Sequence, residues 1–369
     1  MIKLSKSCIS QAEKNYVADV LGREFLGMGN EVNIFEEKLT FFFERPTLCV
    51  INGTAALHLA LQSCDIGIND EVLVPSITYL ASFQAISATG AKPIPCDINK
   101  DNLLINLNDA QKKLTSKTKA IMPVHYAGDV GDLNSIYKFA NQNSIRVIED
   151  AAHAFGTLYD EKKVGSFGDI ACFSFDGIKN ITSGEGGCVV TNDNNVIKKI
   201  KDSRLLGVEK DTEKRFSGER SWDFDVSKQG WRYHMSNIMA AIGIVQLERF
   251  NELSEKRRKL AIRYDELLKD SSKVNTIDRN YELIVPHIYA VKLTKSVDRK
   301  IIQKKMLSKG IEVGYHYQPN HWLSYYKSKT MPPLKVTESV FPKLLTLPLH
   351  PDLSYSDIKF VVNELKKII

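Results

Sequence analysis

Several features that would direct the search for a function elsewhere are missing from this chain of 369 residues. No apolar run is long enough to cross a bilayer, and the first residues lack the long apolar core of a secretion signal. The six cysteines show neither a paired spacing nor a histidine partner pattern, which argues against a disulfide framework and a zinc site. We therefore predict a cytoplasmic protein with reduced thiols, without a bound metal and without a membrane partner.

The chain also lacks a complete dinucleotide fingerprint and a basic stripe. Gly27 and Gly29 form an isolated G-x-G with no third glycine and no preceding strand, which argues against a nicotinamide-dependent sugar enzyme. The net charge of +6 comes from intermixed signs, and the run at 255–259 is expected to be a solvated helix face. Nucleic acid is therefore not expected as a partner, whereas a mild positive excess suits anionic small molecules.

Short apolar strands alternate with helices over the first half of the chain. The expected strands are 48–51, 71–75, 92–97, 120–125 and 146–149, and the expected helices include 7–20, 32–43, 53–61, 78–86 and 132–142. Strands that are apolar on both faces and alternate with helices are typical of a parallel sheet covered on both sides. The sequence thus predicts an α/β fold with a mainly parallel sheet flanked by helices.

The C-terminal part has a different pattern. A polar, irregular stretch at 203–229 precedes one long helix at 238–268, and a strand at 283–291 and helices at 299–309 and 356–367 follow. This pattern predicts a large domain over residues 1–245 and a smaller α+β domain over residues 246–369, with the long helix joining them.

The most informative segment is the glycine-rich turn that contains Lys179. An apolar strand at 173–175 leads into the turn, and a second strand at 188–190 follows it directly. Glycines permit conformations and close approaches that side chains would block. A lysine held there away from bulk water can lose its proton and act as an amine nucleophile. Because an isolated lysine on a hairpin is usually a surface residue, the interpretation depends on its neighbours.

Those neighbours match the needs of pyridoxal phosphate, which are a lysine, a carboxylate for the ring nitrogen and a phosphate cradle. Lys179 supplies the first. Asp150 supplies the second, because it follows a strand at the carboxyl edge where such sheets bind ligands. The expected cradle combines a helix N-terminus with a hydroxyl group: Gly53, Thr54, Ala55 and Ser174. Tyr79 offers a face for stacking, and His153 could bond the ring hydroxyl oxygen.

Several segments resemble, in order and spacing, the nucleotide-sugar aminotransferases of the DegT type. They are 52–61, 149–156, 165–169, 173–187 and 231–243, with a similar tail at 346–351. The resemblance covers nearly the whole chain. It implies the fold of aspartate aminotransferase (fold type I) and a homodimer with active sites at the subunit interface. It also implies transfer of an amino group from L-glutamate to a keto sugar nucleotide.

The resemblance also implies roles for single residues. Lys179 matches the Schiff-base lysine, Asp150 the partner of the ring nitrogen, and His153 a position beside the ring oxygen. Further matches are the phosphate ligands Thr54 and Ser174, the stacking residue Tyr79, and the substrate-facing residues Glu185, His316, Tyr317 and His321. Two positions depart from the family pattern. Arg232 stands where asparagine commonly reaches the phosphate of the neighbouring subunit's cofactor, and Asp176 stands where histidine is common.

The turn after Lys179 resembles that of the branch that acts at sugar C4 more than that of the C3 branch. We therefore predict conversion of dTDP-4-keto-6-deoxyhexose to a 4-amino-4,6-dideoxy sugar for surface polysaccharide, such as lipopolysaccharide O-antigen. Amination at C3 and UDP or GDP carriers remain open. A related sugar dehydratase would have histidine in place of Lys179. A regulatory protein that kept only the fold would not need Lys179, Asp150 and Ser174 together.

Overall fold

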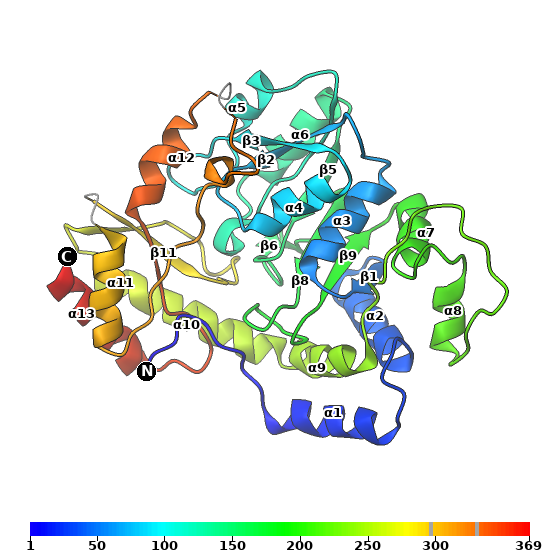
Figure 1. Ribbon diagram of the computed structural model, residues 1–369. Helices are drawn as coiled ribbons and strands as arrows, with labels where there is room; N and C mark the ends of the chain where they lie inside the picture. The colour runs from blue at the N-terminus through cyan, green and yellow to red at the C-terminus, as the bar shows by residue number, and fades with distance from the viewer. Residues whose placement is uncertain (295–297, 329–331) are drawn as a thin grey trace.

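The computed structural model describes residues 1–294, 298–328 and 332–369, and a seven-stranded sheet forms its larger part (Figure 1). In sheet order the strands are β1 (Thr47–Val50), β9 (Gly187–Thr191), β8 (Ile170–Ser174), β5 (Arg146–Asp150), β4 (Thr118–Ile121), β2 (Glu71–Pro75) and β3 (Lys92–Cys96). Strand β9 is antiparallel to both of its neighbours, β1 and β8, and the other neighbouring strands pair in parallel. The predicted mainly parallel sheet flanked by helices is confirmed.

Helices cover both faces of this sheet. In chain order they are α1 (Gln11–Gly22), α2 (Asn30–Phe43), α3 (Gly53–Ser63), α4 (Leu80–Ala88), α5 (Leu107–Lys112), η1 (Tyr126–Gly128), α6 (Leu133–Gln142), α7 (Asn194–Ser203), α8 (Asp211–Phe216) and α9 (Asn237–Glu248). One apolar cluster joins α2, α6 and α9 to the sheet, and a second joins α3, α4 and α7 to it. The strands are apolar on both faces because both faces are buried.

A three-stranded antiparallel sheet forms the C-terminal part. It consists of β10 (Val274–Thr276), β11 (Tyr289–Leu293) and β12 (Leu344–Leu347), and it packs with α10 (Phe250–Leu268), α11 (Arg299–Ser308) and α13 (Tyr355–Ile368). Short helices α12 (Lys335–Val340), η2 (Asn320–Trp322) and η3 (Phe341–Lys343) and a small ribbon of β6 (Leu158–Tyr159) and β7 (Lys162–Lys163) complete the described elements. The chain's first residues also reach this part, where Ile2 pairs with Ile311. The division at 245/246 stays a proposal.

The strand expected at 120–125 is β4 at Thr118–Ile121, and the helix expected at 7–20 is α1 at Gln11–Gly22. Three other predicted elements differ more. The long helix expected at 238–268 is interrupted at Arg249, where α9 ends and α10 begins (Figure 1). No glycine or proline stands at the break, so the sequence carries no local signal for it. The strand expected from 283 begins only at Tyr289, after Pro286, which has no backbone donor for a ladder. The stretch expected to be irregular at 203–229 contains α8.

The sheet brings the predicted site residues together at one edge. Asp150 ends β5 and pairs with Cys172 of β8, and Ser174 ends β8 and pairs with Gly187 of β9. The segment between β8 and β9 carries Lys179 over the same edge, and α3 begins beside it. Among the described helices, none combines the length and apolar character that crossing a bilayer requires.

Candidate active site

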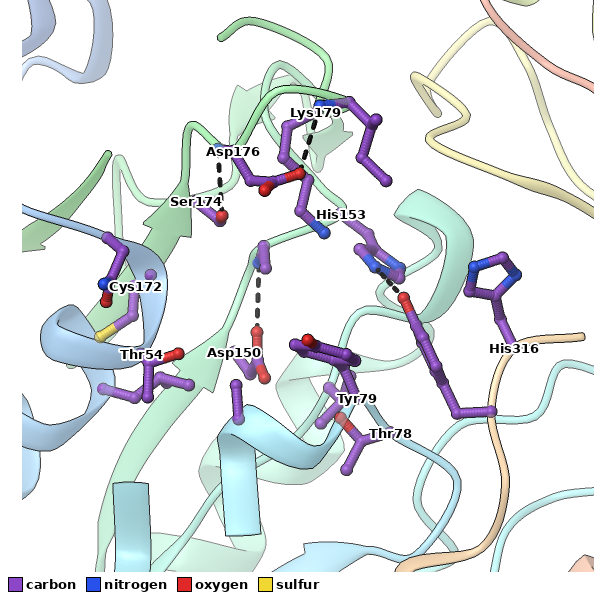
Figure 2. A pocket seen from close by; sticks show the side chains of 18 of the residues that line it. Thr54, Thr78, Tyr79, Asp150, His153, Cys172, Ser174, Asp176, Lys179 and His316 are labelled. Atoms are coloured by element: carbon purple, nitrogen blue, oxygen red, sulfur yellow. Dashed lines mark hydrogen bonds between the residues drawn. The ribbon is translucent and has the colours of Figure 1, made fainter. Parts of the chain in front are cut away.

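A cavity of about 370 Å³ lies at the carboxyl ends of β5 and β8 (Figure 2). Most of the predicted site residues line it: Gly53, Thr54, Tyr79, Asp150, His153, Ser174, Lys179, Glu185, His316 and Tyr317. Asp176, the position that departs from the family's histidine, lines it as well. These side chains come from segments spread over most of the sequence, so the fold itself assembles the cavity.

The amine of Lys179 points into this cavity, toward the space bordered by Asp150, Tyr79 and His153 (Figure 2). Arg257 of α10 fixes the backbone at Lys179. Its guanidinium donates to the carbonyl oxygens of Ile178 (3.2 Å) and Lys179 (3.3 Å). Burial lowers the pKa of the Lys179 amine to about 8, although the charges of Asp150 and Asp176 act in the opposite direction. A substantial share of the neutral, nucleophilic amine is therefore present near neutral pH.

Asp150 presents a buried carboxylate to the same space. Its Oδ2 accepts a hydrogen bond from Ser82 Oγ at 2.6 Å, and its Oδ1 accepts one from the amide of Ala152 at 3.3 Å. Its backbone is fixed by bonds to Pro123 O (2.9 Å) and from the amide of His125 (3.1 Å). No ion pair within the described residues includes this carboxylate. A buried anion with neutral donors only is suited to a cationic N–H group of a ligand.

The predicted phosphate cradle lies at the start of α3. A Cβ on Gly53 would lie 2.8 Å from Ser174 Cβ, so only glycine allows the helix to begin this close to the hydroxyl. Asn52 caps α3 and accepts a bond from the amide of Ala55 at 2.8 Å, and Ala55 does not line the cavity. The first-turn amides of Gly53 and Thr54 have no intrahelical acceptor. Gly53, Thr54 and Ser174 therefore face the cavity, whereas the amide of Ala55 is bonded to Asn52. The phosphate role of these four residues stays a prediction.

His153 has a defined tautomer. Its Nδ1 accepts a hydrogen bond from the amide of Ala127 at 3.2 Å, so a neutral ring carries its proton on Nε2 and donates it to the Tyr317 hydroxyl at 3.0 Å. Burial, with the nearby Lys179, holds the pKa of His153 well below its ordinary value. The Tyr317 hydroxyl is left free to donate its own proton toward a ligand. Tyr79 remains 62% exposed beside it, with an open ring face.

Two further predicted residues lie outside the cavity of their own chain. Arg232 is exposed. His321 is buried, and its ring contacts Ser76 Oγ at 2.6 Å and Glu338 Oε1 at 3.2 Å. The roles predicted for Arg232 and His321 stay predictions.

The structure also shows neighbours of the site that the sequence analysis missed. Arg257 was expected on a solvated face but is only 2% exposed, because its guanidinium binds backbone carbonyl oxygens. His287 approaches the amine of Lys179 with its Nε2 at 3.4 Å, and Ser82 holds Asp150. A polar residue in an otherwise apolar segment was the only available signal for Ser82 and His287, and the charged run concealed Arg257.

Comparison with known proteins identifies the family. The profile of the DegT/DnrJ/EryC1/StrS aminotransferase family matches residues 7–366. The chain belongs to this family. It is 35% identical to the uncharacterized protein MJ1066 of Methanocaldococcus jannaschii, over 99% of this chain and 96% of that protein. The sequence prediction of a nucleotide-sugar aminotransferase that depends on pyridoxal phosphate is thereby confirmed.

Solved structures of sugar aminotransferases have the same fold as this chain. The putative sugar aminotransferase Spr1654 from Streptococcus pneumoniae superposes with a TM-score of 0.92 in its PMP form, at 29% identity over 100% of this chain and 97% of that one. Its PLP form gives a TM-score of 0.91. Helicobacter pylori PseC, an aminotransferase involved in the biosynthesis of pseudoaminic acid, gives 0.92 at 27% identity, over 100% of this chain and 98% of that one. The predicted fold type I is confirmed.

The residues that line the cavity suit pyridoxal phosphate, the cofactor of this family, by their own chemistry. The cationic nitrogen of a flat pyridinium ring suits the Asp150 carboxylate, which lacks a cationic partner among the described residues. An aldehyde carbon suits the amine of Lys179, and a phosphate group suits the start of α3 at Gly53 and Thr54. Three chemically different groups, each suited to one part of pyridoxal phosphate, thus border one cavity.

Proposed function

We propose that the enzyme transfers the amino group of L-glutamate to a dTDP-linked 4-keto-6-deoxyhexose and so forms a 4-amino-4,6-dideoxyhexose. The observation that carries the proposal is the placement of the Lys179 amine and the Asp150 carboxylate around one cavity. The choice of C4 rests on the resemblance of the Lys179 turn to that branch of the family. A product used for surface polysaccharide is part of the same proposal.

The contacts support the following residue roles. Lys179 would hold the cofactor covalently, Asp150 its ring nitrogen, Ser174 and the first amides of α3 its phosphate, and Tyr79 its ring face. Bound pyridoxal phosphate supplies an electron sink for the electrons of a broken Cα–H bond. Lys179 Nζ, once released, takes the proton from Cα of glutamate as a general base and later delivers a proton to the sugar carbon that receives the amine. A pKa of about 8 suits an amine that must both accept and return a proton.

We propose that the sugar contacts Glu185, His316 and Tyr317, which line the cavity. His316 is oriented by a 2.9 Å contact between its Nδ1 and Thr346 Oγ1, and burial lowers the pKa of its ring to about 4, so it is a neutral hydrogen-bonding group. Burial beside Asp176 raises the pKa of Glu185. We assign these three residues to the sugar nucleotide, and the role proposed for His321, which lies outside the cavity, rests on the resemblance.

We also propose a homodimer with shared active sites. Arg232 lies on the surface, outside the cavity of its own chain. This position supports a role in the active site of a second copy, where a guanidinium would bind the cofactor's phosphate.

A substrate screen tests the proposed reaction. The purified enzyme, loaded with pyridoxal phosphate and supplied with L-glutamate, is offered 4-keto and 3-keto 6-deoxyhexoses on dTDP, UDP and GDP. NMR of the products identifies the aminated carbon. We expect turnover with the dTDP-4-keto sugar and formation of 2-oxoglutarate. Turnover with only a 3-keto sugar, or only with a UDP or GDP carrier, would replace the substrate assignment, and no turnover with any of them would contradict it.

A further inference from the structure

A chain of two buried hydroxyl groups leads to the carboxylate of Asp150. Ser82 and Thr78 are fully buried, at 0% and 1% exposure, and their hydroxyl oxygens lie 2.8 Å apart. Ser82 Oγ donates to Asp150 Oδ2 at 2.6 Å. An ionised carboxylate can only accept, so the single proton of Ser82 is used on Asp150. Thr78 must therefore donate to Ser82, which fixes the direction of the chain from Thr78 through Ser82 to Asp150.

This series of hydrogen bonds starts at Thr78, whose backbone is itself fixed by hydrogen bonds. Thr78 precedes α4, and Asn320 of η2, at 1% exposure, donates through its Nδ2 to the carbonyl oxygens of Thr78 (2.8 Å) and Ser76 (3.1 Å). The same turn carries Tyr79, the residue predicted to stack on the cofactor ring. The turn before α4 thus positions both the stacking residue and, through Ser82, the partner of the ring nitrogen.

We propose that Ser82 is a positioning residue for the reaction, which orients the Asp150 carboxylate against the cofactor's ring nitrogen. Ser82 does not line the cavity, so it acts through Asp150. With Ser82 on Oδ2 and the amide of Ala152 on Oδ1, the carboxylate plane cannot rotate without losing a bond. A carboxylate held in one orientation would accept a charge-assisted hydrogen bond from a protonated ring nitrogen, and a misoriented carboxylate would stabilise that proton less. This inference rests on the proposed role of Asp150.

The variant Ser82→Ala removes the final donor, and Thr78→Val, which has nearly the same shape, removes the donor before it. Because Thr78 also lines the cavity, its variant is judged by the nitrogen signal and not by kcat/KM. Enzyme is loaded with pyridoxal phosphate that is isotope-labelled at the ring nitrogen, and NMR reports whether that nitrogen is protonated. For Ser82→Ala we expect the signal to move toward that of an unprotonated ring and kcat/KM to fall about tenfold to hundredfold, as for loss of a hydrogen bond to a charged group. For Thr78→Val we expect a smaller change of the nitrogen signal in the same direction.

Two controls separate this role from a purely structural one. Ser87→Ala removes a hydroxyl from the same helix, where Ser87 Oγ contacts Tyr326 at 3.3 Å outside the cavity, and it should leave the nitrogen signal and kcat/KM unchanged. Ser82→Thr keeps the donor and should retain the wild-type signal. If Ser82→Ala does not yield folded protein, the Thr78→Val result decides.

The Asp150→Asn variant separates failure of this inference from failure of the function. A nitrogen signal altered by Asp150→Asn but unaffected by Ser82→Ala and Thr78→Val would overturn the role of Ser82 and leave Asp150 in place. A signal unaffected by Asp150→Asn would remove the proposed role of Asp150 itself. A loss of kcat/KM in Ser82→Ala with an unchanged nitrogen signal would also count against the positioning role.

Discussion

Titration of the Lys179 amine in the cofactor-free enzyme should give a midpoint near pH 8, well below the ordinary lysine value of 10.5. Burial disfavours the ammonium form, and the buried guanidinium of Arg257 adds to this effect. At pH 7 about 9% of the molecules would carry the neutral amine, against about 0.03% for an ordinary lysine, a difference of roughly 300-fold. This enrichment is what makes rapid attachment of an aldehyde possible near neutral pH.

The assay is competitive labelling of the cofactor-free protein with a trace amount of an acylating reagent. A peptide amine of ordinary pKa serves as the internal standard, and mass spectrometry quantifies the Lys179 peptide. Because only the neutral amine reacts, labelling should rise about tenfold per pH unit below pH 8 and become constant above it. Labelling of Lys179 that continues to rise up to pH 10 would refute the reasoning.

The variant Asp176→Asn tests how a neighbouring negative charge changes the pKa of Lys179. The charge of Asp176 raises the pKa of Lys179 and so partly offsets burial. Asparagine removes this charge but keeps an oxygen that can accept the 3.2 Å bond from the amide of Ile178. The labelling midpoint should therefore move to lower pH. A shift to higher pH would show that the charge of Asp176 does not act on the amine as described.

Two predictions concern the subunit contact and the core. Mixed dimers of Lys179→Ala and Arg232→Ala should regain about a quarter of wild-type activity through one intact site in each heterodimer, and an absence of recovery would contradict a shared active site. Glu36→Gln should destabilise the protein by about 3–5 kcal/mol in denaturant unfolding, because it leaves the fully buried Arg204 without its carboxylate. The exposed pair of Lys38 and Glu248 is the control, and Glu248→Gln should cost about 1 kcal/mol or less.

The parts of the site that local patterns determine could be predicted from the sequence. Asp150 follows an apolar strand, and in a parallel sheet the strand ends meet at one edge, so its place beside Ser174 follows from topology. The glycine-rich turn likewise places Lys179 at that edge. Asn52 illustrates where a local rule admits two outcomes. The segment could be a phosphate-binding turn or an ordinary helix cap by Asn52 or Thr54, and in the structure Asn52 caps α3 by accepting from the amide of Ala55.

The remaining parts depend on contacts between distant segments. Ser82 and Asp150 are 68 residues apart, and nothing in the helix around Ser82 indicates its partner. Arg257 lies in a run of charged residues that is typical of a solvent-exposed helix, and only the packed structure shows that backbone carbonyl oxygens surround it. The interruption at Arg249 is similar, because no glycine or proline marks it in the sequence.

The guanidinium of Arg257 also constrains how the protein can move and how it denatures. It bonds simultaneously to Ile178 and Lys179 in the β8–β9 segment and to His287 and Leu349 beside the smaller sheet. A swinging motion between the two sheets would break these bonds and leave a positive charge in an interior without counter-ions. We therefore expect access for large substrates to depend on peripheral segments, and heat to melt both sheets in a single cooperative transition.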